Sequence, residues 1–259
     1  MKGGGESEKQ CRNGQKEIEI ETGENWDDCN DMGPMQAADI IAMLLWFIKS
    51  AVQEGTLFNA DKIIAYGHSH GAYLAYLTNR LCPGLLRVII DNSSYIFPDY
   101  LHCSRMVRYA DENGKRYSVS GNIKYLVMRE PHMRLQEEFY HLLYLYSNFK
   151  NECRIISLHG TKDAMAAIGE KKIFIDKIGE KAALAAIQPY NVDGVIFKNA
   201  EHGLGADFIK LYQAVAQRIP FTEGKNLVIP DSVVIEGNRE SLKISYDGLI
   251  PHLEWNKKY

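Results

Sequence analysis

The sequence is short of cysteine and proline, and neither sign of charge is in clear excess. Its 259 residues include five cysteines and eight prolines. An odd cysteine count without a CxxC pair excludes a disulfide scaffold and predicts a reduced, cytoplasmic compartment. Lys plus Arg (30) nearly balances Asp plus Glu (33), a net charge of −3. This balance argues against nucleic acid or an anionic membrane as the main partner, since both require a basic face.

Long apolar segments are also missing. Residues 1–10 contain no apolar core of the kind a secretory signal needs. The longest apolar run, residues 40–48, is much shorter than the ~20 residues of a membrane span. We therefore predict neither a signal peptide nor a membrane-spanning helix.

Composition divides the chain into three regions. Residues 1–33 are polar and glycine-rich, residues 34–220 carry most apolar segments, and residues 221–259 have short β-like runs at 226–229, 232–235 and 242–246. A short strand is expected at residues 16–20. Residues 35–53 predict a helix with Asp31 as its N-cap; because this helix is apolar almost all round, we expect it to be buried.

Short apolar runs alternate with helical segments through the middle region. Strands without polar alternation, separated by helices, are typical of a parallel sheet covered on both faces, so the predicted fold is a three-layer α/β/α sandwich. The expected strands are residues 62–66, 87–90, 154–158 and 194–197, and the expected helices are 72–80, 164–186 and 207–218.

A long insertion separates the second and third of these strands. We predict that residues 92–152 form a cap above the carboxyl ends of the strands, where α/β sheets bind ligands. The insertion should contain a hairpin around Asn113-Gly114 and a helix over residues 135–149.

Gly67-His68-Ser69-His70-Gly71 is a G-x-S-x-G pentapeptide between a predicted strand and a predicted helix. This setting is typical of a nucleophile elbow, a strained turn that exposes a serine hydroxyl. The backbone at Gly67 and Gly71 is expected to leave no room for a Cβ atom. The N–H of His70, at the start of the helix, would be one donor of an oxyanion hole.

A serine nucleophile needs a base, and the base needs an acid to orient it. Asp163, in the HGTKD segment, and His202, in AEHG, each follow an apolar run. The chain order serine, acid, histidine is that of this class of site. Asp91, at the end of another predicted strand, is a competing acid that we rank second. Such a triad predicts a serine hydrolase acting on the ester or amide acyl group of a small molecule, without a metal or organic cofactor. Acyl transfer to another alcohol stays open.

The motifs GHSHG, HGTKD and AEHG together resemble an α/β-hydrolase of the prolyl-oligopeptidase or esterase type. NDMGPMQAADII, GHSHGAYLAYL and VIIDNSSY resemble a bacterial α/β-hydrolase family of unknown function over about residues 30–215. The resemblance implies a Ser69–Asp163–His202 triad and leaves the substrate unspecified.

The chain departs from that fold in its first part. Only 61 residues precede the elbow strand, so we expect an N-terminally abbreviated sheet. There is no HGG-type loop to supply a second oxyanion donor. The elbow strand would then be an exposed edge, through which the chain could pair with a second copy or with a partner chain.

Two other functions remain open at this stage. His68 and His70 resemble the HxH pair of metal-dependent hydrolases, with His159, His202 and Asp163 as further ligands. A truncated hydrolase that lacks part of its oxyanion site could instead serve as a binding or scaffold protein. The lysine pair Lys171-Lys172 is interpreted as solvated surface.

Overall fold

The computed structural model describes two compact units. The smaller comprises residues 1–31 and 98–135, and the larger residues 32–97 and 136–259. The described residues of the larger unit are 33–56, 59, 62–97, 137–219, 221 and 228–258. Those of the smaller unit are residue 98 and six strands, 9–10, 16–17, 20–21, 105–110, 116–121 and 123–124.

A four-stranded sheet, in the order β10-β9-β5-β4, forms the centre of the larger unit, and every neighbouring pair is parallel. Because side chains alternate between the faces of a strand, Val88 and Ile90 of β5 join one apolar cluster, while Ile89 and Asp91 face the other way. The strands are β4 (Ile64–His68), β5 (Val88–Asn92), β9 (Arg154–Gly160) and β10 (Ala182–Ile187).

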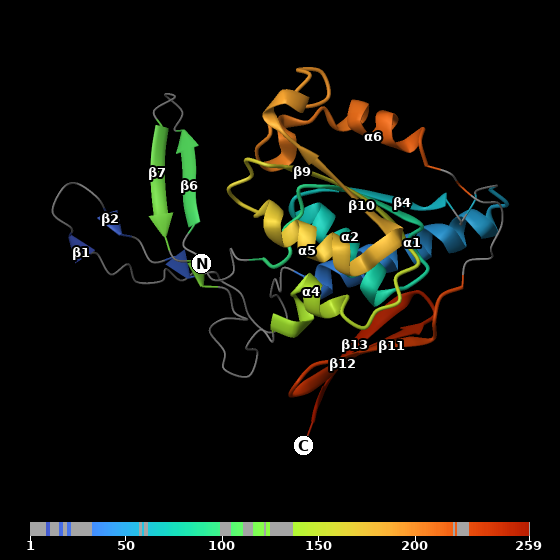
Figure 1. Ribbon diagram of the computed structural model, residues 1–259. Helices are drawn as coiled ribbons and strands as arrows, with labels where there is room; N and C mark the ends of the chain where they lie inside the picture. The colour runs from blue at the N-terminus through green and yellow to red at the C-terminus, as the bar shows by residue number, and fades with distance from the viewer. Residues whose placement is uncertain are drawn as a thin grey trace. The chain divides into compact units, whose positions relative to one another are not determined.

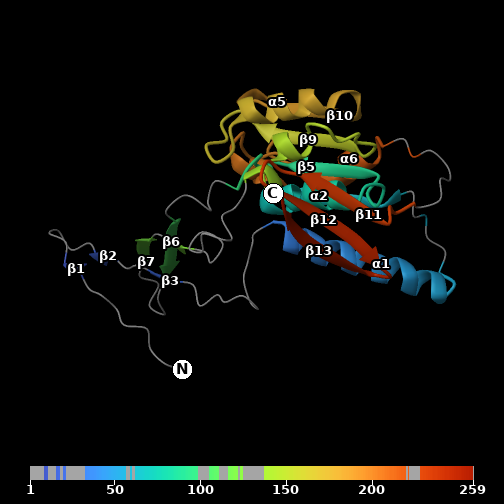
Figure 2. The same cartoon turned by 90° about the horizontal axis from the view of Figure 1, so that it is seen from below.

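Helices cover both faces of this sheet. Leu211 of α6 (Phe208–Ala216) packs into the cluster that contains Val88 and Ile90. Tyr76 of α2 (His70–Leu81) and Lys171 of α5 (Ile168–Ile178) contact Asp91 on the opposite face. Figure 1 shows α6 on one side of the sheet and α2 and α5 on the other, and Figure 2 gives the same layers from below. The predicted three-layer sandwich is confirmed.

The fourth strand is not where the sequence pattern placed it. Residues 194–196 form bends and Phe197 is irregular, because Asp193 Oδ1 accepts the N–H groups of Val195, Ile196 and Phe197 and so removes them from any ladder. The strand is instead β10, within the predicted helix 164–186. That helix, α5, ends at Ile178 before Gly179, whose φ is +79°. Pairing with β9 overrides the helix preference of the alanines in β10.

The long helix α1 (Pro34–Gln53) has the predicted length and a different N-cap, Gly33 rather than Asp31. The expectation that it would be buried all round is wrong. It packs along α2 with one face, while Met43, Trp46 and Phe47 are each more than half exposed. By length and composition alone, α1 is apolar enough to cross a membrane. Core helices of soluble proteins pass the same test.

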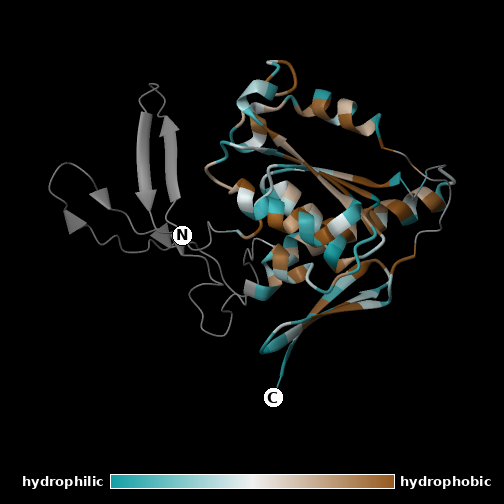
Figure 3. Ribbon diagram, viewed as in Figure 1, coloured by the Kyte–Doolittle hydropathy of each residue, from teal (hydrophilic) through white to brown (hydrophobic). Residues whose placement is uncertain are grey.

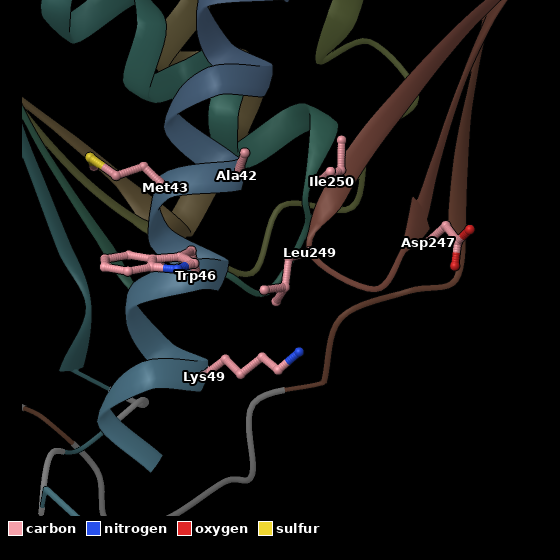
Figure 4. A pocket seen from close by; sticks show the side chains of 7 residues that line it. All are labelled: Ala42, Met43, Trp46, Lys49, Asp247, Leu249 and Ile250. Carbon is pink, nitrogen blue, oxygen red and sulfur yellow. The ribbon is translucent and has the colours of Figure 1, made fainter. Parts of the chain in front are cut away.

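An apolar groove lies between α1 and the turn that joins β12 to β13 (Figure 4). Ala42, Met43 and Trp46 line one side, and Figure 3 shows apolar residues on the part of α1 that is visible in that view. The other lining residues are Lys49, Asp247, Leu249 and Ile250. None of these residues belongs to the loops that carry the predicted triad.

The C-terminal region forms a three-stranded antiparallel sheet of its own, and its role as an extension of the core stays a prediction. Its strands are β11 (Ser232–Glu236), β12 (Glu240–Asp247) and β13 (Ile250–Lys257). Residues 228–229 of the predicted run 226–229 are not in a strand, and residues 226–227 lie outside the described ones.

The insertion contains the predicted hairpin, since β6 (Arg105–Ala110) and β7 (Arg116–Gly121) pair antiparallel around Asn113-Gly114. The predicted helix 135–149 is wrong. Between residues 137 and 149 only η4 (Glu137–Phe139) and the four-residue α4 (Leu142–Leu145) are helical. The remaining short strands are β1 (Lys9–Gln10), β2 (Lys16–Glu17), β3 (Ile20–Glu21) and β8 (Ile123–Lys124). The role of residues 92–152 as a cap stays a prediction.

Strand β4 ends the strand order, and no strand within the described ranges pairs with its outer side. Tyr66 of β4 stacks on Phe208 of α6, with 3.8 Å between the ring centroids. Association of the chain through this edge, with a second copy or a partner, stays a prediction.

Candidate active site

Ser69 occupies the turn between β4 and α2 in a conformation that few non-glycine residues adopt. Its φ is 52° and its ψ is −117°. Backbone hydrogen bonds hold the turn: the Ser69 N–H donates to the carbonyl of Asn92 (2.9 Å), and the Ser69 carbonyl accepts from Tyr73 N–H (3.1 Å). A strained residue that its surroundings hold in place is typical of a nucleophile elbow.

The two elbow glycines differ in the space that surrounds them. A Cβ on Gly67 would lie 2.4 Å from the backbone nitrogen of Ala72, so only glycine fits. At Gly71 a Cβ would meet nothing within 4 Å. The predicted steric requirement is therefore correct for Gly67 and wrong for Gly71, because Gly71 lies in the first turn of α2 and faces open space.

His202 lies between the other two residues of the predicted triad. It belongs to the short helix η7 (His202–Gly205), which follows β10 through η6 (Pro189–Asn191); η5 (Gly179–Lys181) lies just before β10. Its Nε2 is 2.8 Å from Ser69 Oγ, and its Nδ1 is 2.9 Å from Asp163 Oδ2. The structure thus brings Ser69, Asp163 and His202 together. The His202 side chain is 16% exposed, so solvent reaches the base.

The loop after β9 presents Asp163 to His202 with its carboxylate enclosed. Oδ1 accepts the N–H groups of Met165 and Ala166, both at 2.9 Å. Burial alone raises the pKa of this carboxyl, but the hydrogen bonds from His202, Ala166 and Met165 outweigh burial and place the pKa below its ordinary value. Asp163 is therefore a carboxylate at neutral pH and orients the imidazole through Nδ1–H.

His159, near the end of β9, is buried and contacts this loop. Its buried Nε2 lies 2.8 Å from the Ala166 carbonyl and 3.3 Å from Asp163 Oδ2. Burial and the charge of Lys171 lower the pKa of His159, so the ring is neutral and its Nε2–H donates. His159 Nδ1 has no hydrogen-bond partner within the described part of the chain.

Asp91, the competing acid, does not contact His202. Its Oδ2 accepts from Lys171 Nζ (2.9 Å), Tyr76 Oη (2.8 Å) and Ser157 Oγ (2.8 Å), and its Oδ1 accepts from Ser94 N–H (2.8 Å). Burial alone raises the pKa of Asp91. The charge of Lys171 and the hydrogen bond that Lys171 donates outweigh burial and lower this pKa below its ordinary value.

The interpretation of Lys171 as solvated surface is wrong. Its side chain is 1% exposed and is paired with Asp91, whose side chain is fully enclosed. The register of α5 against β5 and β9 turns Lys171 inward, whereas its neighbour Lys172 is exposed. No local sequence pattern distinguishes Lys171 from Lys172, because the residue that pairs with Lys171, Asp91, lies 80 positions away.

His68 and His70 do not converge on a common point. The ring of His70 is held by Gln36 Oε1 (2.6 Å from Nε2) and by the hydroxyl of Tyr95 at Nδ1. His68 lies beside His202, with 5.6 Å between ring centroids, and burial and then His202 lower its pKa. Among the residues that the structure describes, no three His, Cys, Asp or Glu side chains cluster as metal ligands do. This arrangement does not favour the metal-hydrolase alternative.

The strand–turn–helix around Ser69, the parallel sheet and the order of Ser69, Asp163 and His202 define an α/β-hydrolase-type core. Residues 23–222 match the family described as "Protein of unknown function (DUF2920)". The chain therefore belongs to this family. No curated protein matches the chain.

Solved structures of esterases are among those similar to the chain. Esterase 2 of Thermogutta terrifontis, in its apo form, is 17% identical, with a TM-score of 0.42 over 73% of this chain and 68% of that one. Its butyrate-bound form is 16% identical, with a TM-score of 0.42 over 73% and 69%. The esterase domain of a Rhodothermus marinus protein is 13% identical, with a TM-score of 0.37 over 60% and 59%.

Proposed function

We propose that the chain is a serine hydrolase that cleaves the ester or amide bond of a small acyl substrate. The observation that carries this proposal is the position of His202, within hydrogen-bond distance of both Ser69 Oγ and Asp163 Oδ2. A hydroxyl is a weak nucleophile until a base removes its proton, and the base must be held in one tautomer. These three side chains meet both requirements.

The proposed reaction has two steps. Ser69 Oγ attacks the acyl carbonyl while His202 Nε2 takes its proton, and His202 then returns that proton to the leaving alcohol or amine. A water molecule next attacks the acyl-serine, with His202 again as base, and releases the carboxylic acid and free Ser69. Asp163 keeps the proton of the neutral ring on Nδ1 and stabilises the imidazolium in each step.

The tetrahedral intermediate carries a negative charge on the former carbonyl oxygen. The backbone N–H of His70, in the first turn of α2, is the donor that we assign to this oxyanion. The helix dipole adds to its effect, since the N-terminus of a helix favours negative charge. The chemistry requires neither a metal nor an organic cofactor.

Labelling and hydrolysis test this proposal. A fluorophosphonate probe should modify the wild-type chain at Ser69, as read by mass spectrometry, and should not modify Ser69→Ala. Hydrolysis of p-nitrophenyl esters of graded acyl length should fall by about 10⁴-fold or more in Ser69→Ala and in His202→Ala. Ser147→Ala is the matched control, because Ser147 is an exposed serine whose hydroxyl, within the described residues, donates to the Tyr144 carbonyl and to no other group. A folded wild-type chain that neither reacts with the probe nor hydrolyses any ester would favour a binding or scaffold role.

A further inference from the structure

Two consecutive residues at the end of β5 serve opposite faces of the sheet. Because side chains alternate along a strand, Asp91 points toward α2 and α5, where it binds Lys171. Asn92 therefore points toward the face covered by α6, where the loop that carries His202 lies. Asn92 is 2% exposed. A buried amide side chain requires hydrogen-bond partners, and the partners of Asn92 belong to the candidate site.

Asn92 is bonded to two of the three loops of the triad. Its backbone carbonyl accepts the N–H of Ser69 at 2.9 Å. Its side-chain Nδ2 donates to the carbonyl of Gly203 at 3.1 Å, and its Oδ1 accepts the hydroxyl of Ser93 at 3.1 Å. The nucleophile and the residue next to the base are thus attached to one residue.

The loop after His202 needs such support because of its backbone. Gly203 has a φ of +72° and Leu204 a φ of +62°, and leucine rarely adopts that conformation. This loop packs closely against the residue that precedes Ser69, since a Cβ on Gly203 would lie 2.2 Å from His68 Nε2. A small rotation of the loop would change the distance between His202 Nε2 and Ser69 Oγ.

We propose that Asn92 is a positioning residue that sets the distance between the nucleophile and its base. This inference rests on the proposed function, since it assigns Asn92 a role in the reaction of Ser69 with His202. Its amide acts through Gly203 and does not contact the reacting atoms. A displacement of about 1 Å at a reacting pair can cost about 10²-fold in rate.

The main competing explanation is that Asn92 only stabilises the fold, and the structure offers a matched control for it. Asn79 of α2 is 1% exposed, and its Nδ2 donates to Tyr146 Oη and to Asn151 Oδ1, both at 2.9 Å. Asn79→Ala removes an equally buried amide away from the triad. Asn92→Ala should still fold, because the Gly203 carbonyl also accepts the N–H of Ala206 at 3.1 Å.

The experiment measures the second-order rate constant of fluorophosphonate labelling at Ser69, together with kcat and KM for an acyl ester. In Asn92→Ala we expect the labelling rate constant and kcat to fall about 10- to 100-fold while KM changes less than about 3-fold. In Asn79→Ala we expect a comparable loss of Tm, with the labelling rate constant within about 2-fold of wild type. Asn92→Asp keeps the side-chain volume and loses the amide N–H donor. It should show the same fall in the labelling rate constant and in kcat, and it replaces Asn92→Ala if that variant does not fold.

The outcomes separate the two proposals. If the wild-type chain is not labelled at Ser69, the proposed function fails. If the wild-type chain is labelled and Asn92→Ala reacts at the wild-type or Asn79→Ala rate, the positioning role of Asn92 is overturned and the proposed function stands.

Discussion

Two buried carboxylates at the ends of neighbouring strands have different partners. Asp91, at the end of β5, is paired with Lys171, which is itself buried, whereas Asp163, after β9, is hydrogen-bonded to His202, which solvent reaches. Lys171 forms an enclosed ion pair with its acid, whereas the His202 ring also contacts Ser69 Oγ and is open to solvent. A buried carboxylate paired with an enclosed ammonium group therefore holds elements together, while one bonded to an accessible imidazole can orient a general base. The partner, more than the burial of the acid, separates a structural site from a candidate active site.

The largest expected effect comes from exchanging each acid for its amide. Asp163→Asn should lower kcat about 10³- to 10⁴-fold, because the amide can donate to His202 Nδ1 and then stabilises the wrong tautomer. Its Tm should fall less than that of Asp91→Asn, since an amide oxygen still accepts from Met165 and Ala166. Asp91→Asn should lower Tm strongly and leave kcat of the folded fraction within about 10-fold of wild type. Steady-state kinetics and thermal unfolding check both, and an equal loss of kcat in the two variants would remove the distinction.

Removing the partner of each acid should separate the two sites by stability. Lys171→Met leaves Asp91 buried without a counter-ion and should lower the free energy of unfolding by about 3–5 kcal/mol. His202→Ala leaves Asp163 with two backbone N–H groups and should cost about 1 kcal/mol. Urea unfolding monitored by circular dichroism gives both values. The double variant Asp91→Asn/Lys171→Met should lose less free energy of unfolding than the two single variants lose together, because the two residues form one pair. Additive losses would contradict the pairing.

The pH dependence of stability should report both acids. The pKa values of Asp91 and Asp163 are lowered in the folded state, so the unfolded chain binds their protons first as the pH falls. Their stabilising contribution is fully present above the unfolded pKa of about 3.9 and is lost as the pH falls through the folded pKa.

Asp163→Asn should therefore reduce the slope of unfolding free energy against pH, below about pH 4, by up to about 1.4 kcal/mol per pH unit. Urea titrations between pH 2.5 and 7 measure this slope. Glu170→Gln serves as the control, because Glu170 is an exposed acid for which no hydrogen bond or ion pair is found among the described residues. A slope for Asp163→Asn that equals that of wild type would show that Asp163 titrates alike in both states.

The smallest expected effect separates the two glycines of the elbow. Gly71→Ala should leave the free energy of unfolding unchanged or raise it by up to about 0.5–1 kcal/mol, because alanine favours a helix and its Cβ meets open space. Gly67→Ala should lower it by at least about 1–3 kcal/mol, since the Cβ would overlap the backbone of Ala72. Thermal unfolding of the two variants measures the difference, and equal destabilisation would show that Gly71 is also sterically required.

Local sequence patterns predicted the elements that carry the site. The G-x-S-x-G turn depends on a few adjacent residues, so Ser69 could be placed between a strand and a helix from the sequence. Asp163 was identified because it follows an apolar run that is a strand in the structure. His202 was identified by its order in the chain and its AEHG segment, although the strand expected just before it is irregular.

Other features could not be predicted because they depend on residues far apart in the chain. Segment 182–187 is rich in alanine and predicted a helix, and only its pairing with β9 makes it a strand. Lys171 resembles Lys172 in sequence, and the packing of α5 against β5 decides which of the two is buried. Which face of α1 is exposed depends on the elements that pack against the helix, and the apolar pattern of its sequence does not reveal those elements.

The sequence by itself determined the class of fold, the strained serine turn, Ser69 and His202 as candidate nucleophile and base, and Asp163 as the first of two candidate acids, because each depends on short segments and on their order along the chain. Only the tertiary structure decided which of two buried acids reaches His202 and which one pairs with Lys171. It also placed the amide of Asn92 against the loop of His202. Hydrogen bonds between residues 39 to 111 positions apart make these choices, and their geometry is set by how strands and helices pack.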